Sequence, residues 1–197
     1  MDVKHRFPTA ALLVLVLGSV AVVAILILSS PILHTTTTIN SMEQAKGLAD
    51  QYLVGLSSNF KVVEVEEFSN NFYVRVQESS TKTNAFELLV DRYTGRVMTE
   101  PGPNMMWNTK YGMMGSRGTP TVNMPINSSE VVVYAQRWLD TNLLGAITEE
   151  PETFYGYYTI DVSKNGNIYG MLSVNGYTGD VWYHTWHGAF IEMVEFN

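Results

Sequence analysis

A turn-forming phrase occurs twice in this chain: Asp91-Arg92-Tyr93-Thr94-Gly95-Arg96-Val97 and, 84 positions later, Asn175-Gly176-Tyr177-Thr178-Gly179-Asp180-Val181. A second pair precedes it, because Ile39-Asn40-Ser41-Met42-Glu43 returns as Ile126-Asn127-Ser128-Ser129-Glu130 at an offset of 87. The two offsets nearly agree, which indicates that one building block has been used twice. The repetition predicts the fold, but it identifies no reaction.

The first copy begins with a predicted amphipathic helix. Ser41 is a typical N-cap residue, and apolar side chains follow it at steps of three and four: Met42, Ala45, Leu48, Ala49, Tyr52, Leu53 and Leu56. Three alternating segments then predict antiparallel strands with one buried face: 60–67, 72–78 and 86–90. The Thr94-Gly95 corner turns the chain, and Val97 begins a return strand.

The second copy repeats this order. Ser128 or Ser129 is the expected N-cap of a helix with an apolar face: Val132, Ala135, Trp138, Leu139 and Leu143. Asn165-Gly166 is a strong hairpin signal, and Val181 again begins a return strand. The other strands are expected at 154–162, 168–174 and 189–196.

The order of a helix, three or four meandering strands and a Thr-Gly corner resembles the PepSY-type repeat. The residues that carry the resemblance are Asp91, Thr94, Gly95 and Val97 in the first copy and Asn175, Thr178, Gly179 and Val181 in the second. Asn175 stands where the PepSY-type repeat usually has an acidic residue. The resemblance implies an extracytoplasmic binding or regulatory module, and in propeptides such modules inhibit the adjoining protease. Protease inhibition in trans is therefore one alternative function.

An apolar segment at 10–28 contains only Gly18 and Ser19 as exceptions and, as a helix, would cross the roughly 30 Å hydrocarbon core of a membrane. It is longer than the core of a cleavable signal peptide, which has about 7 to 15 residues. Lys4 and Arg6 precede it, so the positive-inside rule places the remainder outside. We expect a single-pass cell-membrane protein with an extracytoplasmic C-terminal part.

The predicted fold class is α+β, with an N-terminal transmembrane helix followed by two helix-plus-antiparallel-sheet, PepSY-like repeats. Four regions are expected along the chain. They are a cytoplasmic tail with the transmembrane anchor at 1–34, the first repeat at 35–100, a Met-, Pro- and Gly-rich linker at 101–126, and the second repeat with a C-terminal aromatic segment at 127–197.

The composition narrows the possible functions. A net charge of −7 argues against a nucleic-acid partner, and the absence of cysteine excludes disulfides, thiolate metal sites and a thiol nucleophile. The chain has no His-Glu-x-x-His motif, no Gly-x-Ser-x-Gly motif and no glycine-rich phosphate loop. We therefore expect a non-catalytic binding or accessory module, a subunit or regulator of a membrane or surface complex, with a protein partner.

Two segments rich in Met, His and Trp offer an alternative, which is extracytoplasmic copper handling. Thioether sulfur suits Cu(I), and imidazole suits copper or zinc. The candidate metal ligands are Met105, Met106, Met113, Met114, His184 and His187. The same segments also fit simple packing of the linker or a docking surface, for which the candidate partner-binding residues are Trp107, Tyr111, Trp182 and Trp186.

Two acidic groups, at 64–67 and 149–152, receive a simpler interpretation. Alternation places Glu64 and Glu66 on one outward strand face, and no aspartate-glycine calcium loop accompanies them. We expect these carboxylates to be solvated surface charges.

Overall fold

The structure, a computed structural model, describes residues 38–113 and 120–196. These residues belong to one compact unit, Thr36–Asn197. The predicted α+β class is confirmed, because the described chain consists of helices and antiparallel sheets. No helix in the described ranges is long and apolar enough to span a membrane, and the predicted span at 10–28 lies outside them.

The first repeat forms as its sequence pattern predicts. Its helix α2 (Met42–Val54) starts at Ser41, whose side chain accepts a hydrogen bond from the Gln44 backbone. Four strands follow in an antiparallel meander, β1 (Phe60–Phe68), β2 (Asn71–Glu78), β3 (Asn84–Asp91) and β4 (Val97–Thr99). At the Thr-Gly corner, Asp91 accepts hydrogen bonds from the Tyr93 and Thr94 backbones, as Asx turns do.

The second repeat has the same order, with three differences from the prediction, the first being that Val131 and not Val132 is buried on the helix face. The N-cap of α4 (Ser128–Asn142) is Asn127, which forms a capping box with Glu130. Strand β5 (Ala146–Thr153) is an additional element. The sequence does not predict it, because its Thr-Glu-Glu-Pro-Glu run shows no apolar alternation. The remaining strands are β6 (Tyr157–Lys164), β7 (Asn167–Asn175) and β8 (Val181–Tyr183).

The last strand, β9 (Phe190–Glu195), forms where a strand is predicted but pairs with β1 of the first repeat. The first sheet therefore has the order β4-β3-β2-β1-β9, and the second has the order β5-β6-β7-β8. This crossing ties the end of the chain to the first sheet. No sequence periodicity indicates it, because alternation describes a strand but not its partner.

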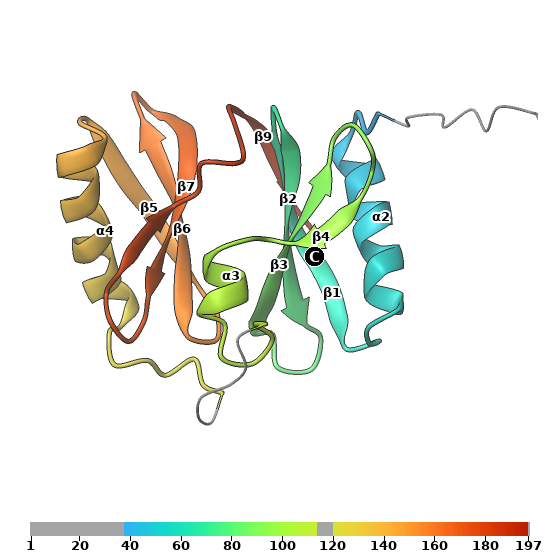
Figure 1. Ribbon diagram of the computed structural model, residues 1–197, viewed down its shortest axis with the longest axis horizontal. Coiled ribbons are helices and arrows are strands. Elements are labelled where there is room, and N and C mark those ends of the chain that lie inside the picture. Colours follow the sequence, from blue (N-terminus) through green and yellow to red (C-terminus); the bar gives the residue numbers. More distant parts are fainter. Residues whose placement is uncertain (1–37, 114–119, 197) are drawn as a thin grey trace, which may run out of the picture. The chain divides into compact units, whose positions relative to one another are not determined.

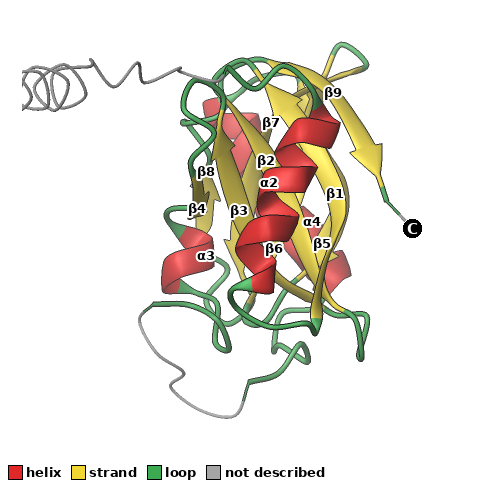
Figure 2. Cartoon of the chain, turned by 90° about the vertical axis from the view of Figure 1, so that its right-hand side faces the viewer, coloured by secondary structure: helices red, strands yellow, loops and turns green. Residues whose placement is uncertain are grey.

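The two sheets lie between the two long helices. Figure 1 shows α2 against one side of the first sheet and α4 against the far side of the second, and Figure 2 shows the same arrangement from the side. Each helix face packs on its own sheet in an apolar core, one including Ala49 and Leu88, the other Ala135 and Leu172. A smaller cluster, which includes Phe68, joins the facing sides of the sheets.

This arrangement contradicts the prediction that the strands have a solvated face. Glu64 and Glu66 are 5% and 1% exposed, because the face that they occupy is covered by the second sheet and not by water. Most residues of β1 and β2 are buried, whichever face of the sheet they occupy. The layer between the sheets is consequently rich in polar side chains, which must find partners there.

The predicted linker contains a short helix, α3 (Pro103–Met106). Two buried asparagines fix this segment to β3: Asn104 Nδ2 donates to the Glu87 carbonyl (3.0 Å), and Asn108 Nδ2 donates to the Ala85 carbonyl (2.7 Å). The first part of the linker is thus held against the first sheet.

Leu139 and Leu144 provide a test of the second core. Leu139 is fully buried on the inner face of α4, so Leu139→Ala should lower the free energy of unfolding by about 2–5 kcal/mol. Leu144 is 74% exposed, and Leu144→Ala should change it by about 0.5 kcal/mol or less. Denaturant unfolding of both variants measures the difference, and equal losses would contradict this packing.

Candidate metal centre

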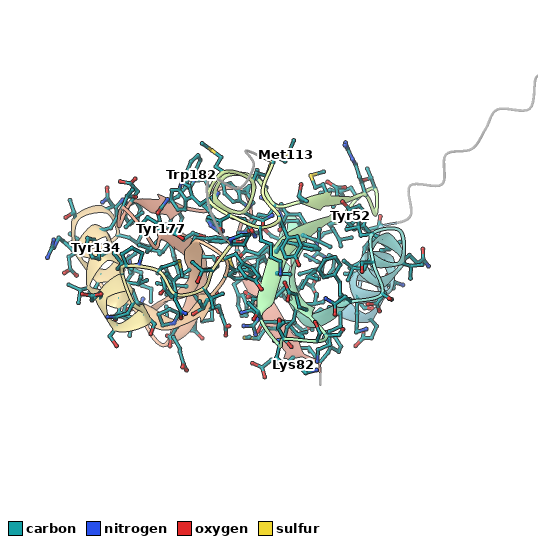
Figure 3. The ribbon with its side chains drawn as sticks, turned by 90° about the horizontal axis from the view of Figure 1, so that it is seen from below. Tyr52, Lys82, Met113, Tyr134, Tyr177 and Trp182 are labelled. Atoms are coloured by element: carbon teal, nitrogen blue, oxygen red, sulfur yellow. The ribbon has the colours of Figure 1, made fainter. Side chains whose placement is uncertain are left out.

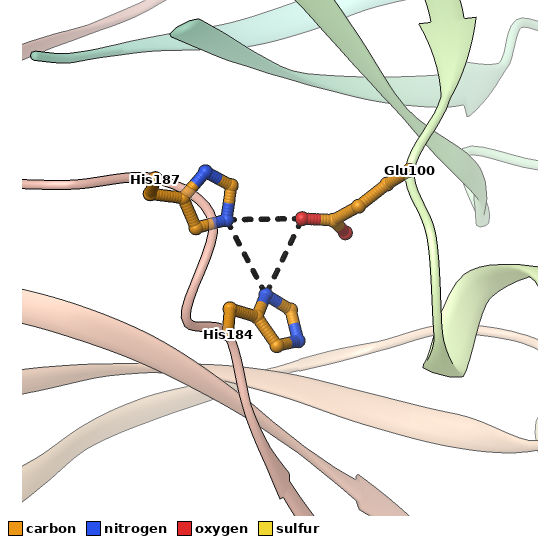
Figure 4. A group of neighbouring side chains, drawn as sticks. All are labelled: Glu100, His184 and His187. Carbon is orange, nitrogen blue, oxygen red and sulfur yellow. Dashed lines mark hydrogen bonds and ion pairs between the residues drawn. The ribbon is translucent and has the colours of Figure 1, made fainter. Parts of the chain in front are cut away.

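Three buried side chains from the two repeats converge between the sheets. Glu100 Oε1 lies 3.3 Å from His184 Nδ1 and 3.0 Å from His187 Nε2, and the two nitrogens are 3.4 Å apart (Figure 4). The exposed fractions of Glu100, His184 and His187 are 0%, 3% and 1%. Within the described parts of the chain, this is the one group of three or more His, Asp or Glu side chains that could hold a metal ion.

Glu100 and His184 occupy the same position in the two repeats, 84 residues apart, each directly after the short return strand. Their backbones are held alike: the Glu100 N–H donates to the Glu87 carbonyl (3.0 Å), and the His184 N–H donates to the Met171 carbonyl (2.9 Å). The pseudo-symmetric exits of the two corners thus bring one carboxylate and one imidazole together. The internal alignment relates Glu100 to His184, although Glu100 is not among the ligands predicted from the sequence.

A bend between β8 and β9 supplies the third side chain. His187 follows His184 by three residues, a spacing that would separate the rings in a strand. Gly188 has a φ of +84°, and a Cβ there would lie only 2.2 Å from Ser69 Oγ. The bend is fixed by the Asn70 N–H, which donates to the His187 carbonyl (3.1 Å). The sequence therefore needs a glycine at this place for the two rings to meet.

The hydrogen bonds of Asn71 define the proton position on His187. Asn71 Nδ2 donates to the Trp186 carbonyl (3.1 Å), so the amide oxygen faces His187 Nδ1 at 2.9 Å. An amide oxygen only accepts, so this network assigns the proton to Nδ1. In the neutral ring, Nε2 then directs its lone pair toward Glu100.

A chain of hydroxyl groups defines the proton position on His184 Nε2. This nitrogen lies 3.0 Å from Ser173 Oγ, which lies 3.1 Å from Thr159 Oγ1, and Thr159 donates to Glu87 Oε1 at 2.5 Å. The carboxylate at the end of this chain accepts, so each hydroxyl donates toward it and accepts from the previous group. His184 Nε2 therefore carries a proton, which leaves Nδ1 as the nitrogen that faces the centre of the cluster.

The charges at the centre favour a cation. Burial lowers the pKa of His187 despite the neighbouring Glu100, so this ring is neutral at pH 7. Burial acts to raise the pKa of Glu100, but His184 and then His187 outweigh it and hold that pKa well below its usual range. Glu100 Oε1 also accepts from Trp186 Nε1 (3.1 Å), while Oε2 is buried without a partner. A metal ion at this point would take the place of the proton with which the imidazoles stabilise the ionised carboxylate.

The dimensions match a first-row divalent ion. Tetrahedral zinc with bonds of about 2.0–2.1 Å has ligand atoms roughly 3.3 Å apart, and the three separations here are 3.0, 3.3 and 3.4 Å. The other nitrogen of each ring is held by a protein oxygen, which is the usual outer support of histidine ligands. Glu100 Oε2 or a water molecule would complete the coordination.

Two of the methionines predicted as ligands, Met106 and Met113, lie at the surface, whereas the cluster is buried. Met106 and Met113 are 51% and 71% exposed, and Met105 is half-buried. Figure 3 shows Met113 at the surface, on the same side as Trp182. Met114 lies outside the described residues. His184 and His187 are brought together, but with a carboxylate in place of thioethers.

The four aromatic residues predicted to bind a partner are distributed differently. Trp107 packs edge-on against Trp182 at 6.0 Å between ring centroids, so the linker does contact the C-terminal aromatic segment. Tyr111 donates to Glu78 Oε1 (2.7 Å), and Trp186 donates to Glu100. Trp182 remains 37% exposed.

Comparisons with known proteins add little to this geometry. Neither the protein-family models nor the curated proteins give a match to this sequence. Among solved structures, the Bacillus megaterium YpeB C-terminal domain is similar, with 10% sequence identity and a TM-score of 0.29. That similarity covers 75% of this chain and 63% of that domain. The fold class therefore rests on the structure of this chain itself.

The pKa of His187 generates a testable pH dependence. A buried histidine whose folded pKa lies below its unfolded value of about 6.5 contributes stability above that value and loses it as the pH falls through the folded pKa. With a chelator present, the stability difference between wild type and His187→Gln should therefore decrease from pH 7.5 to pH 5. Denaturant unfolding at each pH measures it, and a difference independent of pH would refute the assignment of a neutral ring.

Proposed function

We propose that this chain is a non-catalytic, metal-binding accessory module in which a divalent ion, zinc first among the candidates, joins the two repeats. The observation that carries the proposal is the convergence of Glu100, His184 and His187, whose possible ligand atoms lie within 4.8 Å of one another. The ion would neutralise a buried carboxylate and displace any proton held between it and the imidazole nitrogens, while the side chains already lie at ligand spacing.

The burial of the cluster favours a structural role for the ion. Catalytic zinc sites keep one position open to substrate or water, whereas structural sites are closed. All three side chains expose 3% or less of their surface, and Trp186 stacks on His184 with ring centroids 4.7 Å apart. A substrate would have to displace that indole ring to reach the ion.

Zinc is preferred over the predicted copper site because of the ligands that converge. Imidazole and carboxylate suit zinc, while Met106 and Met113, two of the soft thioethers that would favour Cu(I), are exposed at the surface. Divalent copper would also bind this donor set in a test tube, because it ranks above zinc in intrinsic affinity. The distinction therefore depends on the methionines, which zinc does not need.

The place of the module in the cell follows from the sequence. The apolar segment at 10–28 with Lys4 and Arg6 before it supports a single-pass anchor and an extracytoplasmic display. The duplicated corner and the two helix-plus-sheet units support a tandem PepSY-like protein. Among the residues predicted to bind a partner, Trp182 keeps its ring 37% exposed beside α3, which supports a contact with a protein partner.

Zinc titration of the metal-free full chain tests the proposal. We expect one equivalent to bind, and a free concentration 100 times the Kd should stabilise the fold by about 2.7 kcal/mol. Glu100→Gln, His184→Ala and His187→Gln should each weaken binding at least about 100-fold, because each removes a ligand. Ser173→Ala, which removes only the support of one ring, should cost about 10–100-fold.

Met106→Leu combined with Met113→Leu is the matched control, since both residues are exposed and outside the cluster. This double variant should bind zinc as the wild type does. Zinc binding that is absent in the wild type, or that survives all three ligand substitutions, would disprove the metal centre. Copper binding that depends on the two methionines would support the thioether alternative instead.

A further inference from the structure

A polar cavity, which we call the acidic cavity, lies between the sheets and has a volume of about 300 Å³. Seven carboxylic side chains line it, and no lysine or arginine does. They come from both repeats: Glu64 and Glu66 from β1, Glu149, Glu150 and Glu152 from β5, Asp161 from β6 and Glu195 from β9.

Two of these carboxyl groups have oxygens without a partner. Glu66 is 1% exposed and its buried Oε2 accepts no hydrogen bond, although the side chain lines the cavity. Asp161 Oδ1, on the opposite sheet, is buried and unpartnered in the same way. Leaving a buried acceptor unsatisfied costs roughly 1–3 kcal/mol, and more when it is charged. These two oxygens therefore favour a ligand that donates hydrogen bonds.

The basic residue that pairs with the carboxylates of this cavity, Arg75, is already used. Arg75 pairs with Glu64 Oε2 (2.7 Å) and also with Glu152, which in addition accepts from Asn84 Nδ2 (3.0 Å). Glu66 forms no salt bridge within the described ranges, and neither does Asp161. These two groups thus have no cationic partner among the described residues, and a ligand can supply one.

The remaining walls and the spacing of the carboxyl groups restrict the ligand further. Ile168, Met171 and Met193 give the acidic cavity an apolar side. The ligand atoms of the metal centre lie within 4.8 Å of one another, whereas no three carboxylates among the described residues of the acidic cavity converge in this way. A small metal ion is therefore poorly matched to this cavity. A cationic head on an apolar stem fits both kinds of wall.

We propose that the acidic cavity binds a primary ammonium group carried on an unbranched aliphatic chain, either a free amine or a lysine side chain. An ammonium group has three donors that it can direct to single oxygens of separate carboxylates, as Glu66 and Asp161 present them. A guanidinium group instead prefers both oxygens of one carboxylate. The aliphatic stem lies along Ile168, Met171 and Met193.

The protonation of the carboxyl groups agrees with this arrangement. Burial, followed by the neighbouring carboxylates, raises the pKa of Glu66 well above its usual range, and the same causes raise the pKa of Asp161 to about 7. Without a cation, these groups hold protons that an ammonium group replaces.

The test is calorimetric titration of the full chain in mild detergent with pentylamine, with the tripeptide acetyl-Gly-Lys-Gly-amide and with the neutral analogue 1-pentanol. We expect one equivalent of at least one amine to bind and 1-pentanol to bind at least tenfold more weakly. Binding of pentylamine alone supports a small-molecule amine, and binding of the peptide alone supports a protein partner.

Glu66→Gln and Asp161→Asn should each weaken amine binding at least tenfold while keeping zinc binding and the fold, since both substitutions keep the side-chain size. Glu192→Gln is the matched control, because Glu192 is an exposed residue of β9 outside the cavity. The proposal is overturned if neither amine binds, or if Glu66→Gln and Asp161→Asn bind as the wild type does. It is also overturned if Glu192→Gln loses as much affinity as they do, because the attraction would then be non-specific.

Discussion

The placement of the Glu100 carboxylate in the interior, against two imidazole nitrogens, is the constraint on which the rest of the structure depends. A buried carboxylate is costly unless it meets a cation or several donors, and Glu100 has one indole N–H and a buried Oε2 without a partner. The two repeats meet at this point, because Glu100 ends one meander and His184 ends the other. An ion at the centre would neutralise this buried carboxylate and link the two repeats.

The polar layer between the sheets connects this centre to the acidic cavity. Glu87 is fully buried and accepts hydrogen bonds from Tyr73 (2.9 Å), Tyr157 (2.7 Å) and Thr159 (2.5 Å). Tyr73 and Thr159 also line the acidic cavity, and Thr159 reaches His184 through Ser173. Tyr73 and Thr159 occupy equivalent positions of the two repeats, since Tyr73 pairs with Leu89 and Thr159 pairs with Ser173, 84 positions later. One carboxylate therefore organises hydroxyl groups from both copies.

Much of the local structure could be predicted from the sequence. Ser41 marks the start of α2, and the Thr-Gly corners mark the turn before each return strand. Such signals are local, since caps and turns are decided by a few neighbouring residues. Glu100 could have been found as well, because the internal alignment places it at the position of His184.

The rest depends on contacts between distant segments, which periodicity does not describe. Alternation places Glu64 and Glu66 on one face of β1, but it does not show that a second sheet covers that face. It likewise gives no partner for β9, and it gives no bend between His184 and His187. These long-range contacts create both the metal centre and the acidic cavity, so the candidate sites required the fold.

X-ray absorption spectroscopy at the zinc edge of the zinc-loaded full chain tests the central claim most directly. The account predicts nitrogen and oxygen ligands at about 2.0–2.1 Å with the multiple scattering of two imidazoles, which is lost in a variant that combines His184→Ala with His187→Gln. A first shell of sulfur at about 2.3 Å or more, or a spectrum of hydrated zinc without imidazole, would contradict it.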